Sequence, residues 1–170
     1  ALSELAPLHN PSCLAGIRGA RAAFGSDLPM VAVFDTAFHQ TMPEIAKQYA
    51  LPVELVERHQ IRRYGFHGIA HASLADGYAA YTGNPLEVIR LITMQLGNGC
   101  SVTAIAQGRS VETSMGFTPL EGLVMGTRSG DVDASIVGYL SEREKVEAAE
   151  VEQWLNERSG LLGLSGRSND

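Results

Sequence analysis

The sequence predicts a mixed α/β fold, because segments of helical spacing alternate with a short apolar run and three consecutive strand-like segments. The apolar run at residues 31–34 has the length and composition of a buried strand. Residues 91–113 change to a period of two, interrupted by glycine turns, which predicts three strands joined as a meander. Hydrophobic residues make up 45% of the 170, enough to bury a core.

Helices are expected before and after these strands along the chain, and prolines and glycines mark the ends of the helices. Pro43 and Pro52 stand where proline is best tolerated, in the first turn of a helix. Gly25 and Gly160 stand where helices commonly end, and Asp133 is placed to cap another helix. The helices are therefore expected at residues 14–24, 43–50, 52–59, 69–82, 134–140 and 145–158.

Glycine-rich turns and loops connect the elements in the second half of the chain. The strands are expected at residues 91–95, 101–106 and 109–113, with turns at 97–99 and 107–108. A long loop follows at 116–133, and a last loop is expected at 163–166. Glycines permit close approach of the backbone to a ligand, so these loops are where a site is expected.

Charge and hydropathy argue against two classes of protein. Only 19% of the residues are charged and the formal net charge is -6, whereas nucleic-acid binding requires a basic surface. No apolar run reaches the roughly 18 residues that span a bilayer, and the first residues do not resemble a signal peptide. We therefore expect no nucleic-acid partner, no membrane partner and a cytoplasmic location.

The cysteines and the ends of the chain carry two further expectations. Cys13 and Cys100 form neither a CxxC motif nor a zinc site, so reduced thiols are expected, with a single disulfide as the alternative. The chain begins at Ala1 without an initiator methionine and stops at Asp170 after a glycine-rich loop. It is expected to be either processed or a piece of a longer protein.

Four features carry groups suited to chemistry, and each also has a purely structural interpretation. The 97–99 turn can point backbone N–H groups at an anion or simply close a hairpin. Arg128 can bind a phosphoryl or carboxylate group, or pair with Asp131 to brace its loop. His67 stands between glycines, where it either faces a cleft or satisfies a structural role. Together with Asp35, these are the parts required for phosphoryl transfer.

Asp35 follows the apolar run and is itself open to two interpretations. It either orients reacting groups or is an ordinary loop carboxylate. Asp35 and His39 form a possible metal pair, but two ligands are too few to define a site, so no metal ligand is assigned.

These motifs, in this order along the whole chain, closely resemble the acetate kinase family. The resemblance implies a kinase that phosphorylates acetate reversibly with Mg-ATP, built on a two-domain, actin-like (ribonuclease H-like) α/β fold that this chain contains only in part. Propionate or butyrate kinase, and a truncated non-catalytic chain, are the alternatives. The segments that carry the resemblance are 6–11 (APLHNP), 34–39 (FDTAFH), 62–68 (RRYGFHG), 96–99 (LGNG), 113–131 (TSMGFTPLEGLVMGTRSGD) and 159–170.

The resemblance also implies a role for individual residues. Asp35 is similar to the essential aspartate, and His67 and Arg128 to the groups that stabilise the transition state. The turn of Gln95, Leu96, Gly97, Asn98 and Gly99 resembles the ATP phosphate loop, and Asp170 the start of a later nucleotide-binding segment. The pocket for the acetate methyl group, with a supporting histidine, is implied at Leu8, His9, Phe66 and Pro119.

The chain departs from the family pattern in two respects. The phosphate loop usually begins with histidine, whereas Gln95 stands here and cannot carry a positive charge. Family members are also much longer, so residues 1–36 are expected to end one domain and residues 37–170 to begin the next. This chain alone is expected to be inactive and to expose an uncovered sheet face, and the whole protein is expected to be a homodimer.

Overall fold

The computed structural model describes residues 10–170 and divides the chain into two units between Phe34 and Asp35. In the first unit, helix α1 (Asn10–Phe24) ends as expected at Gly25, whose amide donates to the Arg21 carbonyl at 2.9 Å. The buried strand expected at 31–34 is wrong: these residues form no strand, and Val31 is 88% exposed. The only sheet among residues 10–170 contains three other strands, so this apolar run lacks a neighbour to pair with.

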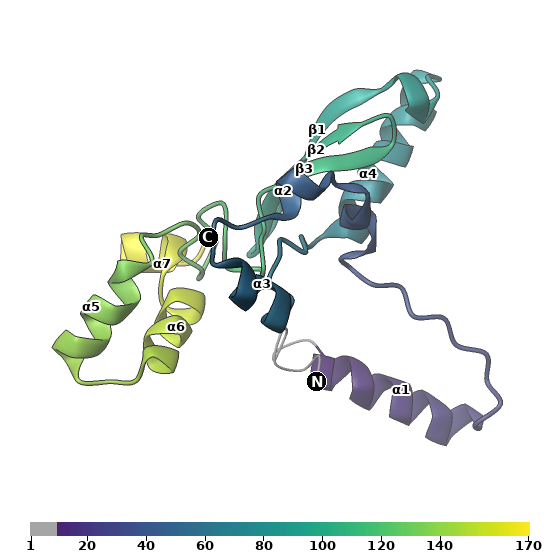
Figure 1. The fold of residues 1–170 in the computed structure, drawn as a ribbon. Coiled ribbons are helices and arrows are strands. Elements are labelled where there is room, and N and C mark those ends of the chain that lie inside the picture. Colours follow the sequence, from purple (N-terminus) through teal and green to yellow (C-terminus); the bar gives the residue numbers. More distant parts are fainter. Residues whose placement is uncertain (1–9) are drawn as a thin grey trace. The chain divides into compact units, whose positions relative to one another are not determined.

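The second unit is built around the expected antiparallel meander, which Figure 1 shows in teal and green. Strands β1 (Arg90–Leu96), β2 (Cys100–Ala106) and β3 (Arg109–Thr113) lie in that order. The first hairpin pairs Leu96 with Cys100, and the register shifts between Ala104 and Ile105 in the second. The three strands confirm the sequence prediction to within one residue at each end.

One face of the sheet is covered by helix α4 (Gly68–Thr82) and the 3-10 helix η1 (Ala37–Thr41). The core beneath them is unusually polar, since it buries two histidines and five hydroxyl side chains. In the described residues no buried side-chain nitrogen or oxygen lacks a hydrogen-bond partner, which is the condition for such a core to be stable. These buried polar residues are His39, His71, Thr93, Ser101, Thr103, Ser110 and Thr113.

The opposite face of the sheet is apolar and open. Ile92, Met94 and Leu96 alternate along β1 and are 67%, 59% and 69% exposed. Val102 and Ala104 of β2 border a shallow groove on the same face. The uncovered face agrees with the expectation drawn from the sequence, and a surface of this kind favours association.

The remaining helices lie mostly where the sequence placed them. Asp133 lies directly before the helix as expected and its Oδ1 accepts a hydrogen bond from the Ser135 amide at 2.9 Å, but the N-cap position of α5 is Ala134. No helix in the described part of the chain is long and apolar enough to cross a bilayer. These elements are α2 (Glu44–Lys47), α3 (Val53–His59), η2 (Leu86–Val88), α5 (Ser135–Glu144), α6 (Ala148–Glu157) and α7 (Gly160–Ser165).

Several helix boundaries differ from the prediction: α1 begins four residues early, at Asn10, and α5 continues four residues further, to Glu144. Three more differ, and left-handed residues explain two of these. Helix α2 stops at Lys47, three residues early. The helix expected from Lys145 begins only at Ala148, because Lys145 has a φ of 60° and ends α5 instead. Gly160 begins α7 rather than ending α6, so the loop expected at 163–166 is helical up to Ser165. Gly160 has a φ of 62°, which glycine adopts without strain.

Candidate active site

Asp35 fixes the turn that presents His67. The His67 amide donates to Asp35 Oδ2 at 2.6 Å, and the Gly68 amide donates to the Asp35 carbonyl at 2.8 Å. His67 itself has φ 58° and ψ 24°, a left-handed conformation that is costly for a residue with a side chain. A β-carbon on Gly68 would clash with the Asp35 carbonyl, so this close approach requires glycine.

His67 and Arg128 both approach Gly99. A β-carbon placed on Gly99 would lie 3.2 Å from Arg128 Nη1 and 3.7 Å from His67 Nε2. The structure therefore brings together an imidazole, a guanidinium and the last residue of the glycine turn, from three separate segments. Because Gly99 has no side chain, a small space remains beside the His67 imidazole and the Arg128 guanidinium.

Arg128 has no carboxylate partner among residues 10–170. Its Nη1 donates to the Pro119 carbonyl at 3.1 Å, and burial lowers the pKa of the guanidinium, which nonetheless stays charged. The suggestion that Asp131 pairs with Arg128 is wrong, because Asp131 Oδ1 accepts from the Gly122 amide at 2.8 Å. A half-buried guanidinium without an acidic neighbour is suited to an anionic ligand.

The loop that carries Arg128 is held in place by helix α7. The amides of Leu161 and Leu162 donate to the carbonyls of Met125 and Gly126 at 2.8 and 2.9 Å. A β-carbon on Gly160 would clash with the Met125 carbonyl, so the left-handed glycine is also what allows this contact. The segment after residue 159 thus contributes to the position of Arg128.

The glycine turn is anchored to the same loop. The Asn98 carbonyl accepts a hydrogen bond from the Gly126 amide at 2.8 Å, and Asn98 Oδ1 accepts one from Asn169 Nδ2 at 2.8 Å. Within the turn the Gly97 amide donates to the Gly99 carbonyl at 3.1 Å. Asp170, next to Asn169, is exposed, so the structure places it near the turn through its neighbour.

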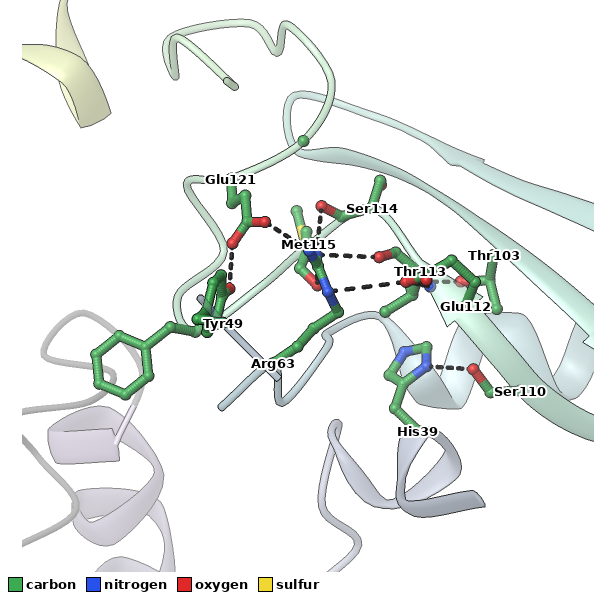
Figure 2. A network of polar contacts seen from close by, with 12 residues as sticks. His39, Tyr49, Arg63, Thr103, Ser110, Glu112, Thr113, Ser114, Met115 and Glu121 are labelled. Atoms are coloured by element: carbon green, nitrogen blue, oxygen red, sulfur yellow. Dashed lines mark hydrogen bonds and ion pairs between the residues drawn. The ribbon is translucent and has the colours of Figure 1, made fainter. Parts of the chain in front are cut away.

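Arg63 braces the segment that leads from β3 into the loop (Figure 2). Its Nη1 donates to the carbonyls of Thr113, Ser114 and Met115 at 3.2, 3.4 and 3.3 Å, and its Nη2 pairs with Glu121 at 2.7 Å. This bracing role was not assigned from the sequence. In the sequence Arg63 was noted only as part of the segment 62–68, which carries the family resemblance.

Tyr49 completes the bracing of this segment. Its hydroxyl donates to Glu121 and accepts from the Phe117 amide at 2.8 Å, as the close-up shows in part. Burial and the neighbouring Glu121 raise the pKa of the Tyr49 hydroxyl, so it stays protonated and remains a donor. A β-carbon on Gly116 would meet both side chains, so the path of the loop depends on glycine here too.

A chain of hydrogen bonds runs from His67 into the polar core. Ser101 Oγ lies 2.9 Å from His67 Nδ1 and 2.8 Å from His71 Nε2, and Thr93 Oγ1 lies 2.7 Å from His71 Nδ1. Burial, with a smaller effect of His39 and His67, lowers the pKa of His71 to about 4. Ser101, Thr93 and His71 could not be selected from the sequence, because buried hydroxyls and one histidine in a helical segment are not distinctive.

The other residues selected from the sequence are placed in different ways. The Phe66 carbonyl accepts from His39 Nε2 at 2.9 Å. Gln95 is half-buried on the covered side of β1, whereas Leu96 lies on its exposed apolar face. Leu8 and His9 lie outside the described residues.

His39 is not available as a metal ligand. Its Nδ1 lies 2.9 Å from Ser110 Oγ, and its Nε2 is used by the Phe66 carbonyl. In the described part of the chain no three histidine, cysteine, aspartate or glutamate side chains gather as a metal site. Both cysteines, Cys13 and Cys100, are free thiols.

A model of the acetokinase family matches residues 1–170. Acetate kinase of Acetivibrio thermocellus is 54% identical over 167 residues, which cover 98% of this chain and 42% of that protein. Acetate kinase of Heliobacterium modesticaldum is 55% identical over 170 residues, covering 100% of this chain and 43% of that protein. The chain thus spans about two fifths of the length of these relatives.

Solved structures match over the same part. A propionate kinase from Francisella tularensis has a TM-score of 0.93 and 49% identity, covering 99% of this chain and 43% of that one. Acetate kinase from Porphyromonas gingivalis has a TM-score of 0.92 and 44% identity, covering 99% and 42%. The mixed α/β arrangement is therefore that of acetate kinase structures over about two fifths of their length.

Proposed function

The chain belongs to the acetokinase family, and on this premise we propose that it supplies the phosphoryl-transfer centre of an acetate kinase. The whole protein converts ATP and acetate to ADP and acetyl phosphate, and catalyses the reverse reaction. The observation that carries this proposal is the meeting of His67 and Arg128 at Gly99. A glycine turn with a guanidinium and an imidazole beside it is an arrangement suited to a transferring phosphoryl group, because the guanidinium and the protonated imidazole both donate hydrogen bonds.

The reaction requires the protein mainly to position the reacting groups and to offset the charge on the transferring phosphoryl group. A carboxylate oxygen of acetate forms a bond to the γ-phosphorus while the bond to the bridging oxygen breaks, and ADP leaves with that electron pair. Acetate is already ionised at neutral pH, so no base is needed to remove a proton. Arg128 and His67 offset the charge on the moving phosphoryl oxygens, and Asp35 holds the turn that carries His67.

The described residues fit ATP and Mg²⁺ in part. The space that a Gly99 side chain would fill accommodates phosphate oxygens beside Arg128, and turn amides supply donors. Mg²⁺ is usually held by one or two carboxylates together with substrate phosphates, a role that the Asp35 carboxylate suits. When bound, the ion neutralises phosphate charge. Gln95 supplies a neutral amide where the family pattern has histidine.

Acetate is the proposed acceptor, with propionate as the second candidate. Phe66 and Pro119, with Leu8 outside the described residues, are proposed to line the pocket for the methyl group. The similarity to a propionate kinase from Francisella tularensis supports the second candidate. One methylene changes selectivity by only about 1–3 kcal/mol, so close relatives can differ.

Steady-state kinetics of the whole protein decide between these acceptors. The protein is assayed with Mg-ATP and acetate, propionate or butyrate, and the acyl phosphate is trapped with hydroxylamine. We expect the largest kcat/KM with acetate. A larger value with propionate would reassign the substrate, and no acyl phosphate from any acid would reject the proposed function.

The architecture of the whole protein is proposed from the same premise. The fold is of the actin-like type, with residues 1–36 ending the first domain and 37–170 beginning the second. The division of the chain between Phe34 and Asp35 supports a boundary near this point. A homodimer in the cytoplasm is proposed from the family. This chain alone is expected to be inactive, so calorimetry with Mg-ATP should detect no tight binding.

A further inference from the structure

We propose that Ser101 and His71 are positioning residues that fix the tautomer and ring orientation of His67. The inference deepens the proposed function and rests on it for the role of His67. The geometric evidence for it is a continuous series of hydrogen bonds from Thr93 through His71 and Ser101 to His67 Nδ1. Three of these side chains, Thr93, His71 and Ser101, are at most 5% exposed, so water does not compete for their hydrogen bonds.

The direction of the series is set at its inner end. In this proposal Thr93 Oγ1 directs its one proton to the Thr103 carbonyl, which lies 3.5 Å away and can only accept. Thr93 Oγ1 must then accept from His71, so the proton of the neutral imidazole lies on Nδ1, 2.7 Å away. His71 Nε2 is left as an acceptor. Burial keeps His71 neutral at pH 7, because it lowers the pKa to about 4.

The same reasoning continues through Ser101 to His67. The Ser101 hydroxyl has one proton and donates it to His71 Nε2 at 2.8 Å. Its oxygen therefore accepts from His67 Nδ1 at 2.9 Å, which places a proton on that nitrogen. The ring is held by this bond with Nε2 directed to the side of Gly99, 3.7 Å from the position of a β-carbon there.

This arrangement has a consequence for phosphoryl transfer. A proton gained or lost at His67 Nε2 changes nothing at Nδ1, so Ser101 and His71 keep their hydrogen bonds in either state. Once Nε2, the nitrogen on the side of Gly99, has gained its proton, it can donate to a phosphoryl oxygen without reorganisation of the core, which is what a pre-organised site requires. If the series ran in the opposite direction, protonation of His67 at Nδ1 would require the Ser101 and Thr93 hydroxyls to turn and His71 to change its tautomer.

Nitrogen-15 spectra of the histidine rings test the inference directly. The whole protein is labelled at histidine, and long-range correlations from ring protons to ring nitrogens report which nitrogen carries the proton. His67→Gln and His71→Gln assign the signals. We expect both rings to carry a proton on Nδ1 near pH 7. A His67 ring with its single proton on Nε2, or a His71 ring with its proton on Nε2, would overturn the proposal.

Matched variants then separate positioning from packing. Ser101→Ala removes the bridging hydroxyl, whereas Ser110→Ala removes an equally buried hydroxyl that contacts His39. Ser101→Ala should change the His67 ring signals and lower kcat by about 10- to 100-fold, the usual effect of losing a group that orients a reactive side chain. Ser110→Ala should leave the His67 signals unchanged. Equal effects of the two variants on these signals would contradict the proposal.

The spectra also distinguish this inference from the proposed function. A protein without kinase activity that shows the expected tautomers would reject the function and leave the hydrogen-bond direction standing. An active kinase with the opposite His67 tautomer would reject the inference alone. If Ser101→Ala fails to fold, the unsubstituted protein still decides the matter, because its tautomers are observed without any variant at position 101.

Discussion

The His67 amide donates a 2.6 Å hydrogen bond to the Asp35 carboxylate, although the two residues stand 32 positions apart in the sequence. This bond ties the residue that opens the second unit to the left-handed turn before α4. It explains why a histidine tolerates a φ of 58° at this point. Asp35 is therefore a structural support of the candidate site as well as a candidate participant in it.

Substitutions of Asp35 should separate its charge from its hydrogen bond. Asp35→Asn keeps an acceptor oxygen, whereas Asp35→Ala removes the acceptor and leaves the His67 amide without it. We expect Asp35→Ala to unfold with about 1–3 kcal/mol less free energy than Asp35→Asn in urea titrations. Both variants should lose acetyl phosphate formation. Equal stability of the two would show that the bond does not support the turn.

Gly99→Ala should impair catalysis more than folding. The added β-carbon would lie 3.2 Å from Arg128 Nη1 and 3.6 Å from His67 Cε1, so it occupies the space proposed for phosphate oxygens. A fall in kcat of at least about tenfold is expected with little change in thermal stability.

Gly77→Ala is the control for this substitution. Gly77 lies within α4, and a β-carbon there would meet nothing within 4 Å. Stability should rise by about 0.5–1 kcal/mol, since alanine favours the helix, and activity should stay unchanged. An active Gly99→Ala enzyme would show that the space beside Arg128 is not used.

The Arg63 network should contribute more to stability through Glu121 than through Glu112. The Glu121 side chain is 30% exposed and accepts from Arg63 at 2.7 Å, whereas Glu112 is 58% exposed and its oxygen lies 3.7 Å away. Glu121→Gln should therefore destabilise by about 1–3 kcal/mol and Glu112→Gln by less than about 1 kcal/mol. Urea unfolding measures both, and the reverse order would contradict the assigned bracing.

The buried histidines should make the fold less stable in mild acid. Burial lowers the pKa of His39 and His71 below the ordinary 6.5, to about 4 for His71. Between these pH values the unfolded chain binds more protons than the folded one, so stability falls as pH falls from about 6.5 to about 4. For His71 alone, the free energy of unfolding should fall by about 3 kcal/mol over this range. Urea unfolding midpoints that stay constant from about pH 7 to about pH 5 would contradict this prediction.

Local patterns were sufficient to predict most elements of the fold. The period-two segments and glycine turns located β1 to β3, and Gly25, Pro52 and Asp133 marked ends of helices correctly. The strand at 31–34 was predicted wrongly, because an apolar run indicates burial but does not supply a neighbouring strand. The role of Gly160 was also missed, since a left-handed glycine can follow one helix or begin another.

The candidate site was predictable only as separate motifs. Asp35, His67, Gly99 and Arg128 each carry a recognisable local signal, and the fold brings them together. Their supporting residues carry no such signal, because a buried serine such as Ser101 acquires its role only through contacts with other segments. Hydrogen bonds between distant residues depend on tertiary geometry, which one sequence does not reveal.

Acetyl phosphate formation by the whole protein with Arg128→Ala tests the central claim most directly. Arg109→Ala, which removes an exposed cation from β3, is the matched control and should leave activity unchanged. We expect Arg128→Ala to lower kcat by about 10³-fold or more, as loss of an arginine that stabilises phosphoryl transfer does. Normal kcat in a folded Arg128→Ala protein would contradict the assignment of this site to phosphoryl transfer.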